Sequence, residues 1–151
     1  MIKIICVGKI KEKYLVEAIE EYKKRIEKFT KVEIIEVKDS SFDDINKNIE
    51  TERELIDKYI DLKDYIITLE IEGKQYTSEN FAKNLDEIFI TNSNITFVIG
   101  GSYGLSKSIK DKSNMHLSFS KMTFPHQLFR VLLLEQIYRA YKINNNESYH
   151  K

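Results

Sequence analysis

Short apolar runs alternate along the chain with longer segments in which apolar and polar positions mix. The short runs predict five strands, at Ile2–Val7, Val32–Val37, Tyr65–Ile71, Ile95–Ile99 and His116–Phe119. The mixed segments repeat apolar residues every three or four positions and predict helices over Lys11–Phe29, from a cap at Ser41–Asp44 to Leu62, from Thr77 or Ser78 to Phe89, from Ser106, and from Pro125 to Ile143. Strands that alternate with helices favour an α/β fold, with a parallel sheet and helices on both faces.

Nothing in the sequence divides the chain into parts. Its 151 residues have the length of one ordinary domain, and five glycines with one proline leave no linker, so we expect a single domain over residues 1–151. In open parallel sheets, ligands bind beyond the carboxyl ends of the strands. That rule directs attention to the loops after Leu69, Ile99 and Phe119.

Two glycine-containing segments follow predicted strands. The loop Gly100–Ser106 has the spacing G-G-x-x-G, which is neither the dinucleotide pattern G-x-G-x-x-G nor a P-loop. It is equally consistent with a loop that lets a ligand approach the backbone and with a plain tight turn. Gly73-Lys74 predicts a turn after the third strand.

The segment Leu117–His126 carries more chemistry. A strand ends there, hydroxyl and apolar side chains crowd together, and the only proline closes the loop. Such a loop can cradle an adenosyl group, with Met122 and Phe124 against the base. The alternative is a plain connection from strand to helix, with Ser120 or Thr123 near the helix cap.

The last predicted helix is apolar nearly all round, which is typical of a helix buried in the core or against a partner. Because no strand follows it, we favour a dimer interface. His126 and Arg130 lie four residues apart on one of its faces, and Arg139 is also on this helix. The chain has only four arginines, so Arg130 is interpreted either as a phosphate or carboxylate contact or as half of a structural ion pair.

Composition narrows the classes of function. The 24 basic and 24 acidic residues give zero net charge, which argues against a protein that coats RNA through a broad basic face. Cys6 is the only cysteine, so no internal disulfide forms, which fits a reducing, cytoplasmic compartment. No stretch has the length of a membrane span, and the three histidines lack metal-ligand spacing, so we expect neither membrane association nor a metal.

Several segments together resemble the ribosomal RNA large subunit methyltransferase H family of the SPOUT class: Ile4–Lys9, Thr68–Lys74, Phe97–Leu105, Leu117–Val131, Leu134–Ala140 and Tyr149–Lys151. The likeness extends over essentially the whole chain. It implies a C-terminal trefoil knot, an exception to the rule that chains avoid knots. It also implies a homodimer packed through the last helix. The implied activity is methylation of N3 of a pseudouridine in large-subunit (23S) ribosomal RNA on the assembled ribosome, with S-adenosylmethionine as methyl donor.

The resemblance also assigns roles to residues. Those expected to line the S-adenosylmethionine site are Leu69, Gly100, Gly101, Phe119, Ser120, Lys121, Met122, Thr123 and Phe124. The catalytic roles are a hypothesis from side-chain chemistry: His126 or His150 acts as the base, and Arg130 steadies developing negative charge or a phosphate. Those expected to touch RNA are Arg139, Tyr149 and Lys151, the last two in a tail that completes the site across the dimer.

Two other functions stay open at this point. One is a methyltransferase that acts on transfer RNA or a small molecule, which a comparison of methyl acceptors distinguishes. The other is a ribosome-associated dimer without catalysis, which lacks affinity for S-adenosylmethionine.

Overall fold

The computed structural model describes residues 1–151 and contains one sheet of five parallel strands. They are β1 (Ile2–Val7), β2 (Val32–Val37), β3 (Tyr65–Gln75), β4 (Ile95–Ile99) and β5 (Met115–Ser118). Their order across the sheet is β2-β1-β4-β3-β5, and every neighbouring pair is parallel. The predicted parallel sheet is confirmed, and the bounds of β1, β2 and β4 match the sequence pattern.

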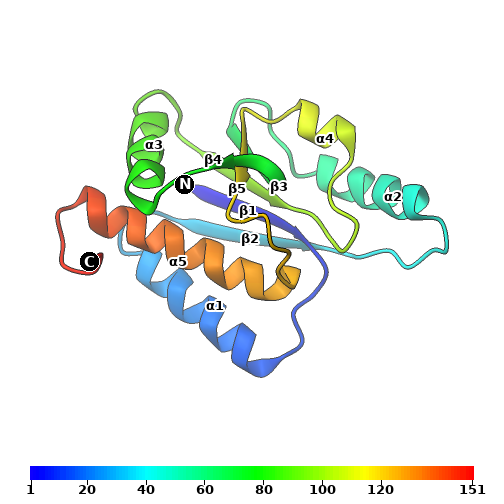
Figure 1. The fold of residues 1–151 in the computed structure, drawn as a ribbon, viewed down its shortest axis with the longest axis horizontal. Helices are drawn as coiled ribbons and strands as arrows, with labels where there is room; N and C mark the ends of the chain where they lie inside the picture. The colour runs from blue at the N-terminus through cyan, green and yellow to red at the C-terminus, as the bar shows by residue number, and fades with distance from the viewer.

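Helices cover both faces of this sheet, as predicted (Figure 1). One face carries α1 (Lys13–Ile26), α3 (Ser78–Thr91) and α5 (His126–Asn144); the other carries α2 (Ile45–Asp57) and α4 (Lys107–Asp111). Successive side chains of β1 point to opposite faces. Ile4 therefore packs in the core beneath α1, α3 and α5, and Ile5 in the core beneath α2 and α4. Burial on both faces explains why the strands are continuous apolar runs.

Three helices begin with a side-chain cap close to the predicted position: Thr77 was predicted as a cap, Ser106 as a helix start, and in the Ser41–Asp44 segment the cap is Asp44 rather than Ser41. The Asp44 carboxylate accepts hydrogen bonds from the amides of Asn46 and Lys47 at the start of α2. Thr77 caps α3 and Ser106 caps α4 in the same way. Each cap satisfies an amide that has no partner within its helix and contributes about 1 kcal/mol.

Other element ends differ from the prediction by a few residues, which is the usual uncertainty of helix and strand boundaries. α1 is shorter at both ends than Lys11–Phe29, and α2 ends at Asp57 rather than near Leu62. β5 begins and ends one residue earlier than predicted.

The predicted turn at Gly73-Lys74 is wrong, because Gly73 lies inside β3. Leu69 and Lys74 both pair with Leu117, so the residues between them bulge out of the ladder. A Cβ atom on Gly73 would lie 2.8 Å from the backbone of His116. Glycine is therefore required here for close approach of two strands rather than for a change of chain direction.

The last helix is part of the core of the single chain. α5 packs between α1 and α3 and buries Leu133, Leu134 and Ile137 completely. None of the helices is both long enough and apolar enough to cross a membrane.

Candidate active site

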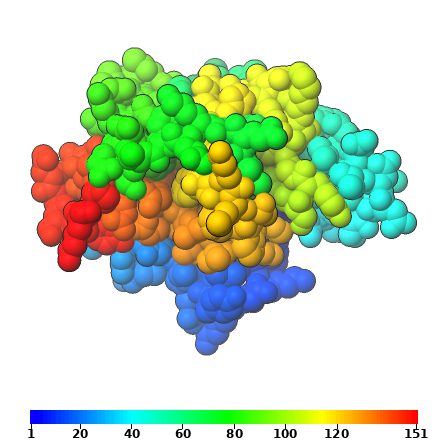
Figure 2. All heavy atoms as spheres, in the orientation of Figure 1, coloured from blue at the N-terminus to red at the C-terminus, as the bar shows by residue number.

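A cavity of about 400 Å³ opens at the carboxyl ends of β4 and β5, beside the bulge of β3. The loops after Ile99 and Phe119 line it, as the strand-end rule predicted, but the segment after Leu69 that also lines it is the bulge inside β3 rather than a loop. The lining residues named in the sequence prediction are Leu69, Gly100, Gly101, Phe119, Ser120, Met122, Thr123, Phe124 and His126. In Figure 2 the segment that joins β5 to α5, coloured gold, lies on the surface below the green extension of β3.

The glycine loop after β4 is both a tight turn and a wall of the cavity. The amide of Gly104 donates to the carbonyl of Gly101 at 3.1 Å, and Gly104 has a φ of +83°. A Cβ on Gly100 would lie 2.7 Å from the backbone of Gly104, and one on Gly101 would lie 3.0 Å from Val7. A side chain is excluded at position 100 and would be tightly crowded at position 101, so both residues line the cavity with backbone atoms alone.

The β3 bulge forms a second wall, which the sequence prediction missed beyond Leu69. The hydroxyl of Thr68 donates to Glu70 Oε2 at 2.6 Å, and the ring of His116 also contacts this oxygen. Lys110 Nζ lies 3.9 Å from the other carboxylate oxygen of Glu70. This network fixes the Glu70 side chain at the cavity wall.

Aromatic rings support the third wall. Phe119 and Phe124 both lie against Phe129 of α5, with ring centroids 4.8 Å and 6.3 Å away. Met122 is 75% exposed at the rim, and its amide is bound by the Ser120 hydroxyl. Lys121, predicted together with its neighbours, does not line the cavity and is exposed.

His126 begins α5 at the edge of the cavity. Its Nε2 atom lies 3.5 Å from the point that a Cβ on Gly8 would occupy, and Gly8 has a φ of +92°. Burial, and then the positive charge of Arg130, lower the pKa of His126 below its ordinary value of 6.5, while Asp39 acts in the opposite direction. The imidazole is therefore neutral at neutral pH and able to accept a proton.

Known proteins are similar to this chain in sequence and in fold. The sequence profile of the family described as "Predicted SPOUT methyltransferase" matches residues 1–150. The chain belongs to this family. A relative from Methanococcus maripaludis is 55% identical over 157 residues, covering 99% of each chain. A second, from Natranaerobius thermophilus, is named ribosomal RNA large subunit methyltransferase H and is 51% identical over 155 residues, covering 98% of each chain.

A solved structure extends the likeness to the fold. The structure of a probable methylase family protein from Haemophilus influenzae matches with a TM-score of 0.58 at 15% identity, covering 99% of this chain and 70% of that one. At this identity the match bears on the fold alone, which is SPOUT-like.

In this SPOUT methyltransferase Arg130 is buried rather than turned into the cavity. Its guanidinium donates to the Glu36 carboxylate at 2.6 Å and to the carbonyls of Val7 and Gly8 at 2.9 Å and 2.6 Å. It does not line the cavity, and only 2% of the residue is exposed. Of the two interpretations of Arg130, this geometry supports the structural ion pair, because its two terminal nitrogens are already bound.

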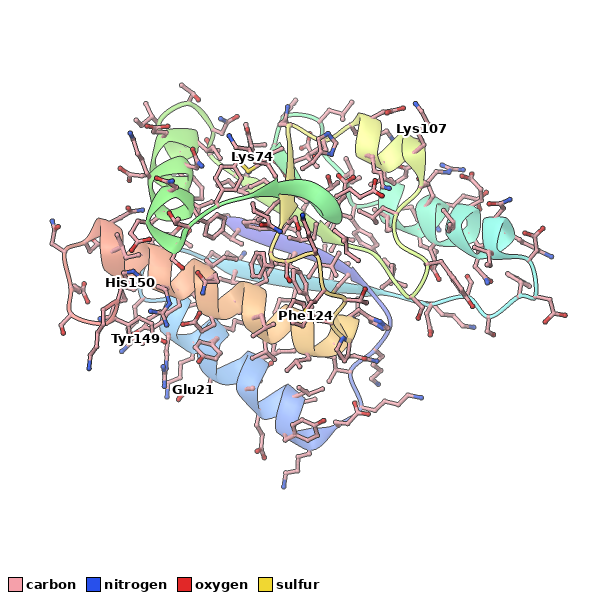
Figure 3. All side chains as sticks on the ribbon, viewed as in Figure 1. Glu21, Lys74, Lys107, Phe124, Tyr149 and His150 are labelled. Carbon is pink, nitrogen blue, oxygen red and sulfur yellow. The ribbon has the colours of Figure 1, made fainter.

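The predicted tail residues form a separate cluster against Glu135 and Arg139 of α5, about 14–20 Å along the helix from His126. His150 contacts Glu79 Oε1 at 2.7 Å and Arg139 Nη1 at 3.0 Å. The hydroxyl of Tyr149 donates to Glu135 at 3.1 Å. Figure 3 labels Tyr149 and His150 toward the C-terminal end of α5 and Phe124 near the other, so the tail and the cavity of one chain do not meet.

The structure contains no group of three or more His, Cys, Asp or Glu side chains that could hold a metal ion.

Proposed function

We propose that this chain transfers a methyl group from S-adenosylmethionine to N3 of a pseudouridine in large-subunit (23S) ribosomal RNA, on the assembled ribosome. The observation that carries the proposal is the convergence of two strand-end loops and the β3 bulge on one cavity, in a chain about half identical over its length to a ribosomal RNA large subunit methyltransferase H. The trefoil knot and the absence of a metal stay predictions from the resemblance and the sequence.

The cavity fits the donor in size and character. Small-molecule sites usually have volumes of roughly 300–1,000 Å³ and combine apolar walls with a few polar groups. Here Leu69, Phe119 and Phe124 would contact the adenosyl group, and the backbone of Gly100 and Gly101 would bind its polar atoms. When bound, S-adenosylmethionine supplies an electrophilic methyl group on its sulfonium, and no other cofactor is needed.

The chain itself has to orient the target base and take up the proton of N3. His126 is suited to accept this proton, because its imidazole is neutral and lies at the cavity edge. Arg130 would be a positioning residue, because it binds the carbonyls of Val7 and Gly8 next to His126. Together with burial, its charge also keeps the His126 imidazole neutral.

The tail would act in a homodimer. His150, with Arg139, Tyr149 and Lys151, would then complete the cavity of the partner subunit and contact its RNA. The exposed apolar side chains Tyr14 and Val16 on α1 and Leu128 on α5 lie on the helical layer that such a dimer would cover.

The test is the transfer of labelled methyl from S-adenosylmethionine to ribosomes, isolated large subunits, naked ribosomal RNA and transfer RNA, all lacking the modification. Label on ribosomes at one pseudouridine is the expected result. Label confined to transfer RNA, or no label on any acceptor although the donor binds, would contradict the proposed substrate. A chain with no affinity for the donor would not be a methyltransferase.

A further inference from the structure

One buried carboxylate of this chain lacks a counter-charge. Glu52 of α2 is only 4% exposed, and its Oε1 atom has no hydrogen-bond partner. Its Oε2 atom accepts one bond from the Ser40 amide at 2.9 Å. A buried charge without an ion-pair partner is unfavourable for folding, so its presence calls for an explanation.

The position of Glu52 suggests one. Oε1 lies 3.2 Å from the point that a Cβ on Gly101 would occupy, and Gly101 lines the cavity. Gly101, which has no side chain, therefore adjoins both this carboxylate and the cavity. A Cβ atom at position 101 would be in tight contact with both Val7 and Glu52.

Two other carboxylates near the site have partners, and Glu72, which also lines the cavity, is exposed to solvent rather than buried. Glu36 is paired with Arg130, and Glu70 is bound by Thr68, with Lys110 nearby. Burial is the main cause that raises the pKa of Glu52. The charged neighbour of Glu52, Asp39, is also negative and raises this pKa further. The Ser40 amide bond acts in the opposite direction and favours the charged form.

We propose that Glu52 is a specificity-determining residue whose negative charge, acting through the bare glycine loop, makes the cavity prefer the cationic donor over the neutral product. S-adenosylmethionine carries a sulfonium charge that S-adenosylhomocysteine lacks. A unit charge at about 10 Å, in a medium of effective dielectric constant of about 20, changes a binding constant by about tenfold. The carboxylate would thus promote exchange of spent product for donor, at the expense of fold stability.

The experiment compares Glu52→Gln with the natural chain by calorimetric titration of each ligand and by urea unfolding at pH 7. This inference rests on the proposed function, since it requires that the cavity bind the donor. We expect the ratio of the two dissociation constants to shift about tenfold against the donor, while the urea midpoint rises. Glu54→Gln is the matched control, because Glu54 lies on the same helix with a side chain 70% exposed. It should change neither quantity.

Two results would overturn the inference. If Glu52→Gln left the ratio of the two dissociation constants unchanged, even with both ligands bound more weakly, the charge of Glu52 would not discriminate between donor and product. A Glu52→Gln chain that is less stable than the natural one, or does not fold, would make Glu52 a structural residue. If the natural chain bound neither ligand, the proposed function would fail first, which is a distinguishable outcome.

Discussion

Arg130 near the start of α5 and Arg139 near its end both bind a glutamate, but in opposite surroundings. Arg130 is buried and joins Glu36 of β2 to the carbonyls after β1, residues more than 90 positions away in the sequence. Arg139 binds Glu135 one turn earlier, lies 4.7 Å from the ring centroid of Tyr149, and keeps a quarter of its side chain exposed. Arg130 links β1 and β2 in the interior. Arg139 instead holds the C-terminal tail against the surface of α5.

The contacts of the tail cluster indicate which tautomer a neutral His150 ring adopts. An arginine nitrogen can only donate, so Nδ1 of His150 accepts from Arg139, and the proton of a neutral ring is on Nε2, facing Glu79. The tail is therefore held by defined contacts rather than frayed. These contacts order the tail on the surface, whereas the contacts of Arg130 order strands in the interior.

The largest expected effect is on stability, from Arg130→Ala. The change leaves Glu36 without its ion-pair partner, with only the Ile10 amide as donor, and removes the side-chain donor to two backbone carbonyls, which lowers the free energy of unfolding by about 3 kcal/mol. Urea unfolding measures it. Arg139→Ala is the control and costs less than about 1 kcal/mol, because its ion pair is partly exposed and within one helix. Equal losses at the two positions would contradict the distinction drawn between the two ends.

The next effect is on activity, from deletion of Tyr149–Lys151. None of these residues lines the cavity of its own chain, and the tail is proposed to contact RNA rather than the donor, so donor affinity should stay within about twofold. Methyl transfer should fall roughly a hundredfold, because the target base is no longer held in position. Calorimetry and labelled-methyl transfer provide the two measurements. Undiminished transfer would remove the tail from the site.

Complementation sharpens this test. The truncated chain is mixed with a chain that has an intact tail but a cavity filled by Leu69→Trp. In a symmetric dimer, an equal mixture forms about half mixed dimers with one complete site each, which restores about a quarter of the natural activity. If the mixture stays inactive, the tail does not act across the dimer.

The local part of this structure could be predicted from the sequence. The spacing of apolar residues and the cap residues predict the strand bounds and the helix starts to within a few positions of those observed. The predicted strand ends also point to the three segments that line the site. What was missed depends on strand register: Thr68 and His116 are neighbours only because β3 pairs with β5. The close approach at Gly73 and the orphan oxygen of Glu52 likewise arise from contacts between distant segments, so no local pattern indicates them.

The smallest expected effect concerns the pH dependence of His126. Because its pKa in the folded chain lies below the ordinary 6.5, the folded state binds fewer protons than the unfolded state there. The contribution of neutral His126 to stability is present above pH 6.5 and is lost as pH falls through the lowered pKa of the folded state. Between pH 7.5 and 5.5, His126→Asn should therefore lose less stability than the natural chain, by under about 1 kcal/mol given its partial exposure. Parallel urea titrations at the two pH values measure the difference. If both chains lost the same stability between the two pH values, burial and Arg130 would not lower the pKa of His126. The buried end of α5 would then have a structural role only.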